Sequence, residues 1–299
     1  MSRIMKIMGL NGSSFAPLLL GFGCSVPAIL STRRIEGRND RLVTIAILPM
    51  MSCAGRLPIY MMFVSALFPS HLQATVLFGI YAAGILLALL CARLLKNTFF
   101  KTVQRDSPHR LKKLRIPSLR KVGLLMWSRA FMYVRKAGTF ILGASIILWF
   151  LNTYPRPEEG TVENAAAAME HSYAGQIGHW MEPVTRVAGF DWKVNSALLG
   201  AFAAKEIFVT QMGILYAVQD GDSGAEAQQT LNARLKASYT PLQGISIMIF
   251  CLIALPCIGT VTVAKREAGT WWFALAQFTG LTLMGFVAAT VVYQAGLLM

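Results

Sequence analysis

The sequence has little charge for its length. Charged residues make up 14% of its 299 residues and hydrophobic residues 55%, whereas a soluble domain carries roughly 25% charged residues. Five long stretches contain no Asp, Glu, Lys or Arg: residues 7–32, 57–92, 137–155, 237–264 and 268–299. A helix needs about 20 apolar residues to cross a bilayer. The scarcity of charge therefore excludes a soluble globular protein and predicts an all-α, polytopic membrane protein.

Sequence motifs for catalysis and nucleotide binding are also missing. The chain contains no Gly-Lys dipeptide, hence no P-loop, and no His-Glu-x-x-His, Gly-x-Ser-x-Gly or Cys-x-x-Cys pattern. The four histidines show no paired metal-ligand spacing. The five cysteines are odd in number and lie in apolar segments, which excludes a disulfide framework. We predict a chain that is not an enzyme and binds no cofactor, with reduced thiols free for packing or for metal.

Positive charge, in contrast, is abundant and concentrated. The net charge is +14, and 13 of the 28 Lys and Arg residues fall between Arg93 and Lys136, opposed there by Asp106 alone. A basic loop beside a membrane helix marks the cytoplasmic side. This concentration favours an inner-surface loop over a nucleic-acid site, with an anionic lipid surface as the alternative.

The apolar pattern predicts about seven membrane segments, several of them broken by Gly or Pro. They lie at about 13–31, 42–68, 72–95, 137–153, 192–217, 241–263 and 270–298. We divide the chain into four regions. Residues 1–95 form a first repeat with broken helices, and residues 96–136 form a basic cytoplasmic linker with an interfacial amphipathic helix over 119–136. Residues 137–191 form a membrane helix with an acidic external connection, and residues 192–299 form a second repeat.

The two repeats are indicated by paired stretches of sequence. LLLGFGCSVPAIL (18–30) resembles ALLGAFAAKEIFV (197–209), and ILPMMSCAGR (47–56) resembles ALPCIGTVTVAKR (254–266). Such pairs are typical of transporters whose related halves meet at a site near the membrane midplane. An inverted arrangement requires one segment to be split or re-entrant. Segment 192–217, which has charge at its centre, is the candidate.

Prolines interrupt the predicted helices beside cysteines. A helical proline removes a donor and clashes with the carbonyl four residues earlier, so Pro27, Pro49, Pro58 and Pro256 are expected to free the carbonyls of Gly23, Ile45, Ala54 and Leu252. Cys24, Cys53 and Cys257 lie next to these breaks, and Gly21 and Gly23 loosen the first one. Thiols with carbonyl oxygens suit Fe²⁺, Zn²⁺ or Cu⁺ rather than Mg²⁺ or Ca²⁺. Ordinary kinks and thiol packing are the alternative, which we prefer for Cys91 and Cys251.

Three charged residues lie within apolar segments. Lys205 and Glu206 occupy the centre of one segment, and charges inside a membrane are functional candidates. Glu206 is expected to bind a divalent cation or a proton, with Lys205 neutralising it in the empty site, although a structural charge network is the alternative. Arg56 follows Cys53 by three residues. Because it would repel a cation, we assign it a gating or structural role.

Several of these stretches resemble one known family. LLLGFGCSVPAILSTRRIEGRNDRLVTIAILPMMSCAGRLPIY, RAFMYVRKAGTFILGASIILWFL, FAAKEIFVTQMGILY and LPCIGTVTVAKREAGTWWFALAQ resemble the bacterial ferrous iron transport protein B family. The resemblance implies Fe²⁺ transport through the bacterial inner membrane, with path roles for Cys24, Cys53, Cys257 and Glu206. It also implies a GTPase domain, absent from this chain, and small cytosolic accessory proteins as partners.

These observations leave three functional classes open. The first is the permease part of a GTPase-linked ferrous iron uptake system, with GTP bound only by a missing or separate domain. The second is a permease for nucleosides or another divalent cation, and the third a non-transporting membrane scaffold, regulatory subunit or truncated fragment. Whether the chain forms a homo-oligomer is also left open.

Overall fold

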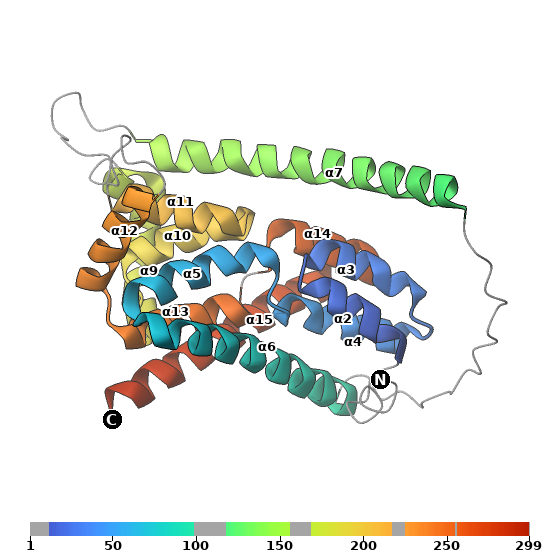
Figure 1. Cartoon of the computed structure of the whole chain (residues 1–299), viewed down its shortest axis with the longest axis horizontal. Helices are drawn as coiled ribbons and strands as arrows, with labels where there is room; N and C mark the ends of the chain where they lie inside the picture. Colours follow the sequence, from blue (N-terminus) through green and yellow to red (C-terminus); the bar gives the residue numbers. More distant parts are fainter. Residues whose placement is uncertain (1–11, 99–117, 156–168, 217–224, 255, 299) are drawn as a thin grey trace.

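The chain is helical throughout the parts that its computed structural model describes, residues 12–98, 118–155, 169–216, 225–254 and 256–298 (Figure 1). Four stretches are long and apolar enough to cross a membrane: Arg38–Leu67, Ser70–Thr98, Pro241–Ala268 and Trp271–Leu297. Shorter apolar helices are Gly12–Gly21 and Leu142–Thr153. The prediction of an all-α polytopic membrane protein is confirmed.

Each predicted segment contains helix, while α9 and α12 lie outside the predicted segments. The bounds of the main helices are α2 (Phe15–Gly21), α3 (Ser25–Ser31), α4 (Arg38–Ile47), α5 (Leu57–Leu67), α6 (Ser70–Thr98), α7 (Leu119–Thr153), α9 (Tyr173–Thr185), α10 (Trp192–Ala203), α11 (Lys205–Leu215), α12 (Ala225–Ser238), α13 (Pro241–Ile253), α14 (Ile258–Ala268) and α15 (Trp271–Leu297).

The segments predicted at 13–31 and 192–217 are each a pair of short helices. The chain turns at Phe22–Cys24 between α2 and α3, and at Ala204 between α10 and α11. In both pairs the two helices pack against each other, and Figure 1 shows them side by side. Segment 192–217 is therefore split, as its charged centre indicated. Each pair forms a hairpin whose turn lies inside the bundle.

The segments predicted at 42–68 and 241–263 are interrupted helices. Short 3₁₀ turns at Leu48–Met50 and Ala54–Arg56 separate α4 from α5, and extended residues separate α13 from α14. Pro49 and Pro58 both lie in the first turn of a new helical element. Proline is well tolerated there, since an N–H in the first turn has no helical partner. The prolines thus fix where the chain re-enters a helix.

The same order of elements occurs twice in the chain, and the elements of the second set run in the opposite direction to those of the first. A hairpin, an interrupted helix and a long helix occur as α2–α3, α4–α5 and α6, and again as α10–α11, α13–α14 and α15, with α12 added. In Figure 1, α4 and α14 lie towards one end of the bundle and α5 and α13 towards the other. The two interrupted helices therefore run antiparallel, as inverted repeats do.

Close packing of glycine shows the register of the two repeats. Gly84 and Gly285 are each the fifteenth residue of their long helix, α6 and α15. A Cβ on Gly84 would lie 3.5 Å from the carbonyl oxygen of Met50, and one on Gly285 would lie 3.0 Å from the backbone nitrogen of Ala254. Each long helix thus packs against the interruption of its own repeat.

One predicted pair of elements is a single helix. Residues 119–136 and 137–153, expected as an interfacial helix and a separate membrane helix, form α7 without a break. This stretch contains no proline, and isolated glycines at 123, 138 and 143 cost helix stability without ending a helix. Most of the basic linker (99–117) and the first part of the acidic connection (156–168) lie outside the described residues.

One end of the bundle carries many cations. It is formed by the turn Thr32–Arg34, the start of α4 and the ends of α6 and α14. We call it the basic end. Its elements are held together by ion pairs from Arg33 and Arg41 to Glu267 and from Lys96 to Asp40. The connection between α3 and α4 and the end of α14 therefore lie on the same side of the bundle.

Candidate functional site

The two hairpin turns and the two helix interruptions share one backbone feature. At each of them a new helix begins directly after a residue with extended backbone. That residue is Cys24 in the first hairpin (φ −155°, ψ 131°) and Ala204 in the second (φ −148°, ψ 131°). In the interrupted helices it is Cys53 (φ −76°, ψ 161°) and Cys257 (φ −62°, ψ 157°). Three of the four equivalent positions therefore carry a thiol.

This equivalence corrects the register of the predicted repeat. The sequence comparison placed Pro49 opposite Pro256, but the backbone places Cys53 opposite Cys257 and Cys24 opposite Ala204. The difference arises because the first interruption contains an additional 3₁₀ turn, Leu48–Met50, which includes Pro49 and precedes Cys53. The prolines are therefore not equivalent, whereas the cysteines are.

Direct contacts bring the interruptions together. The backbone N–H of Ala54 donates to the carbonyl oxygen of Gly23 over 3.1 Å, which joins the first hairpin to the first interrupted helix. The carboxylate of Glu206 lies against Gly55, where an added Cβ would be 2.8 Å from Oε1. Thus the turn of the second hairpin reaches the same interrupted helix, two residues after Cys53.

The second interrupted helix meets both of these elements. An added Cβ on Gly259 would lie 3.4 Å from the side chain of Val26, near the start of α3. The Arg56 side chain donates from Nη2 to the carbonyl oxygen of Ala254 over 3.2 Å. The neighbourhoods of Cys24, Cys53, Glu206 and Cys257 therefore meet between the two repeats. We call this region the junction.

Three of the four carbonyls that were predicted to be freed already accept hydrogen bonds. The Gly23 oxygen accepts from Ala54 and the Ala54 oxygen from the N–H of Leu57, while Gln277 donates to the Ile45 oxygen over 2.8 Å. Pro256 follows α13 after that helix has ended at Ile253, so it breaks no helical hydrogen bond. The prediction failed because Pro27, Pro49 and Pro58 lie in the first turn of a helical element, where the missing N–H would have had no helical carbonyl partner.

Arg56 is one of two buried cations at the junction, with Lys205. Its side chain is 1% exposed and donates from Nη1 to the Met51 oxygen over 3.4 Å, in addition to the contact with Ala254. Its Nε has no partner among the described residues. Arg56 thus ties the two interrupted helices through their backbone carbonyls.

Lys205 and Glu206 face different surroundings. Lys205 is buried and lies within electrostatic reach of Arg56 and of the thiols of Cys53 and Cys257, while Glu206 is exposed. No ion pair joins these two side chains. Adjacent helical residues point about 100° apart, which explains the separation. The predicted neutralisation of Glu206 by Lys205 is not seen in this conformation.

The thiols are reduced and partly accessible. None of the five cysteines, all of which the structure describes, forms a disulfide, and Cys24, Cys53 and Cys257 are half-buried. The Cys257 sulfur lies 3.1 Å from the hydroxyl oxygen of Thr260. Cys251, assigned to packing by its sequence context, is buried yet lies within electrostatic reach of Lys205. Its place one turn before the end of α13 was the signal that could have linked it to the junction.

The junction is not a preformed metal centre. Among the described residues, no three His, Cys, Asp or Glu side chains are grouped closely enough to hold a metal ion. A cavity of about 340 Å³ lies elsewhere, between the end of α5 and α12, where it is lined by residues such as Ser65 and Asn232. The junction instead offers single thiols and one carboxylate on separate elements, which suits successive, weak contacts with a passing cation.

Two family models match the chain. One, described as nucleoside recognition, covers residues 1–67 and 134–271, and the other, described as the C terminus of ferrous iron transport protein B, covers residues 77–129. The chain belongs to the ferrous iron transport protein B family. Within this family it corresponds to the C-terminal membrane region, as the resemblance of its motifs implied.

Curated relatives of the chain are named as ferrous iron transporters of this family. The chain is 37% identical to a fusion of Fe²⁺ transport protein A with the Fe²⁺ transporter FeoB from Porphyromonas gingivalis. The match covers 100% of this chain and 39% of that protein. It is 35% identical to the Fe²⁺ transporter FeoB of Campylobacter jejuni (96% of this chain, 47% of that protein) and 36% identical to that of Staphylococcus aureus (99% and 42%). The chain thus spans less than half the length of these relatives. No solved structure gives a significant match.

Proposed function

We propose that the chain forms the membrane path for ferrous iron in a bacterial inner-membrane uptake system. The carrying observation is that Cys24, Cys53 and Cys257 occupy three equivalent helix starts that meet, together with Glu206, between two inverted repeats. Thiolate and carboxylate ligands suit Fe²⁺, and a permeation site must bind weakly enough to release its ion. The names of the relatives support the same cargo.

The direction of transport follows from the charge of the two ends. We propose that the basic end faces the cytoplasm, since Lys and Arg accumulate on that side of membrane proteins. Iron would then enter from the opposite end, pass the junction and leave beside Arg33 and Glu267. Coupling to GTP would require a GTPase domain or subunit, and the fusion relative supports a small accessory protein as a further partner.

The test is uptake of ⁵⁵Fe²⁺ by cells that depend on this transporter, with Cys24, Cys53 and Cys257 each replaced by Ser. We expect each replacement to lower uptake and the triple replacement to abolish it. Cys91→Ser, on α6, is the matched control. Normal uptake by the triple variant would rule out the thiol path.

A second candidate is nucleoside transport, which is favoured by the description of the larger family model. The junction supplies thiols, one carboxylate and two buried cations, and the ring pair Tyr60–Tyr81 beside Cys53 is an aromatic group that a base could contact. Competition by unlabelled nucleosides separates the two functions. A scaffold without transport activity is tested by reconstituting the chain alone and with its GTPase partner.

A further inference from the structure

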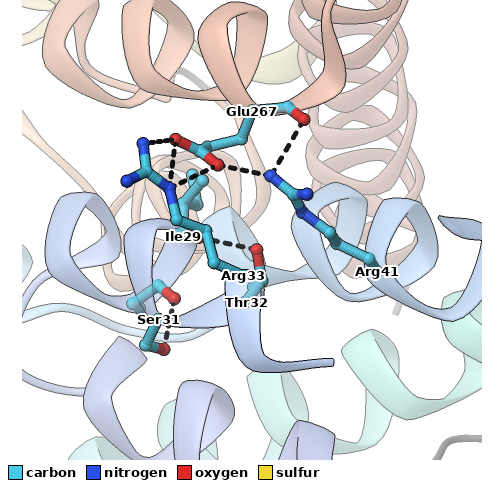
Figure 2. A network of polar contacts seen from close by, with 7 residues as sticks. Ile29, Ser31, Thr32, Arg33, Arg41 and Glu267 are labelled. Atoms are coloured by element: carbon cyan, nitrogen blue, oxygen red, sulfur yellow. Dashed lines mark hydrogen bonds and ion pairs between the residues drawn. The ribbon is translucent and has the colours of Figure 1, made fainter. Parts of the chain in front are cut away.

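A three-residue ionic cluster joins distant segments at the basic end. Arg33 Nε donates to Glu267 Oε1 and Oε2 over 3.0 and 2.9 Å, and its Nη2 lies 2.5 Å from Oε1 (Figure 2). Arg41 Nη2 pairs with Oε2 and also donates to the main-chain oxygen of Glu267 over 3.2 Å. One carboxylate therefore holds the turn after α3 and the start of α4 against the end of α14.

The cluster is built around a buried carboxylate with accessible partners. The side chain of Glu267 is 3% exposed, whereas those of Arg33 and Arg41 are 49% and 28% exposed. Guanidinium–carboxylate pairs with two parallel hydrogen bonds are strong and directional. Because water and salt reach the arginines, the pair can still exchange with solvent, which a fully buried pair could not do.

The helices that meet in this cluster also carry two junction cysteines. Cys24 immediately precedes α3, which leads into the turn with Arg33, and Cys257 immediately precedes α14, which ends one residue after Glu267. The two helices pack along each other. At 1.5 Å per residue, the cluster lies about 15 Å along α14 from Cys257. Separation of α3 from α14 at the basic end would therefore open a route to both thiols.

The opposite end of the molecule is held by different chemistry. There, the Tyr239 hydroxyl donates to both carboxylate oxygens of Asp191 over 2.9 Å, and Arg234 donates to the carbonyl of Tyr216. These contacts fix the second hairpin through a phenol and a main-chain oxygen. The hairpin at the basic end is instead fixed by a carboxylate shared between two guanidinium groups, which responds far more strongly to ionic strength.

We propose that Glu267, Arg33 and Arg41 form an ionic latch that closes the basic end of the path. Opening the latch lets α3 and α14 separate and exposes Cys24 and Cys257 to that side of the membrane. The role in transport rests on the proposed function, whereas the change in thiol exposure does not depend on the identity of the cargo.

The test measures thiol exposure in the full chain, reconstituted in oriented vesicles. A membrane-impermeant maleimide is added on the side of the basic end, and alkylation is quantified for each cysteine by mass spectrometry. In Glu267→Gln, labelling of Cys24 and Cys257 should rise at least fivefold, with Cys91 and Cys251 unchanged. Arg34→Gln, which removes an exposed charge of the turn Thr32–Arg34 that does not pair with Glu267, should behave as the unaltered chain.

A double-mutant comparison and a salt titration complete the test. Arg33→Gln with Arg41→Gln should reproduce Glu267→Gln, and the triple variant should show no further increase, because the three residues act as one unit. In the unaltered chain, labelling of Cys24 and Cys257 should rise with NaCl, while in Glu267→Gln it should be high at every concentration.

Equal labelling of these thiols in folded Glu267→Gln and in the unaltered chain would overturn the latch. If that variant does not fold, the salt titration of the unaltered chain decides, and a flat response overturns the proposal. If thiol labelling responds to salt and to Glu267→Gln but no iron is taken up, only the proposed function is refuted. If iron is taken up but thiol labelling does not change with salt, only the latch is refuted.

Discussion

Arg56 donates a hydrogen bond to the carbonyl oxygen of Ala254, 198 residues further along the chain. The contact joins the interruptions of the two repeats at the level where three cysteines begin new helices. It shows how opened backbone is stabilised inside a membrane protein, since a fixed guanidinium supplies donors that water cannot supply there.

Replacing Arg56 should therefore destabilise the fold. In Arg56→Gln the shorter amide cannot reach both the Met51 and the Ala254 oxygens, and each unpaired buried carbonyl costs about 1–3 kcal/mol. We expect a loss of about 2–4 kcal/mol, measured as a lower thermal midpoint in detergent. Arg266→Gln is the exposed control. An unchanged midpoint would show that Arg56 does not hold the two interruptions together.

Glycine on the long helices provides a second prediction. A Cβ at Gly285 would meet the backbone of Ala254, which cannot rotate away, whereas a Cβ at Gly280 on the same helix meets nothing within 4 Å. Gly285→Ala should cost about 1–3 kcal/mol by overpacking. Gly280→Ala should be neutral or stabilise by up to about 1 kcal/mol. Equal thermal midpoints for the two variants would contradict the close approach.

Glu206 should contribute charge to iron binding without being needed for folding. Its carboxylate is exposed and lies beside Gly55, so Glu206→Gln retains the shape and removes the charge. We expect at least a tenfold weaker effect of Fe²⁺ on the reactivity of Cys53 and an unaltered thermal midpoint. Glu170→Gln, at another exposed carboxylate, is the control. The same Fe²⁺ response in Glu206→Gln would remove this residue from the path.

The contact between Tyr239 and Asp191 should stabilise the second hairpin. Burial, and then the charge of Asp191, raise the pKa of Tyr239 far above its ordinary value, so the hydroxyl keeps its proton at pH 10. Tyr239→Phe should cost about 1.5–3 kcal/mol, as expected for a hydrogen bond to a charged group. Tyr173→Phe removes a hydroxyl at an exposed ring and should be silent. Equal losses would contradict this assignment.

Much of the fold could be predicted from hydropathy and from the charged, Gly and Pro residues that interrupt the apolar segments. Long uncharged runs located the membrane segments, and the charged centre of 192–217 indicated that this segment is split. The continuity of α7 was missed because the basic residues over 119–136 resemble an interfacial helix, while local charge alone does not end a helix.

The candidate site could be predicted in part. Cysteines beside Gly and Pro indicated the interruptions correctly, because these residues mark positions where a helix restarts. The fate of the Gly23 and Ile45 carbonyls could not be predicted, since their partners Ala54 and Gln277 come from other elements. The same holds for the contact of Glu206 with Gly55, which depends on how a hairpin packs against an interrupted helix.

The central claim is that Fe²⁺ contacts the thiols of the junction, and anaerobic alkylation in lipid nanodiscs tests it most directly. Fe²⁺ should slow the alkylation of Cys24, Cys53 and Cys257 and leave Cys91 unaffected, whereas Mg²⁺, which prefers oxygen ligands, should have no effect. Identical alkylation rates for all five cysteines with and without Fe²⁺ would contradict the account.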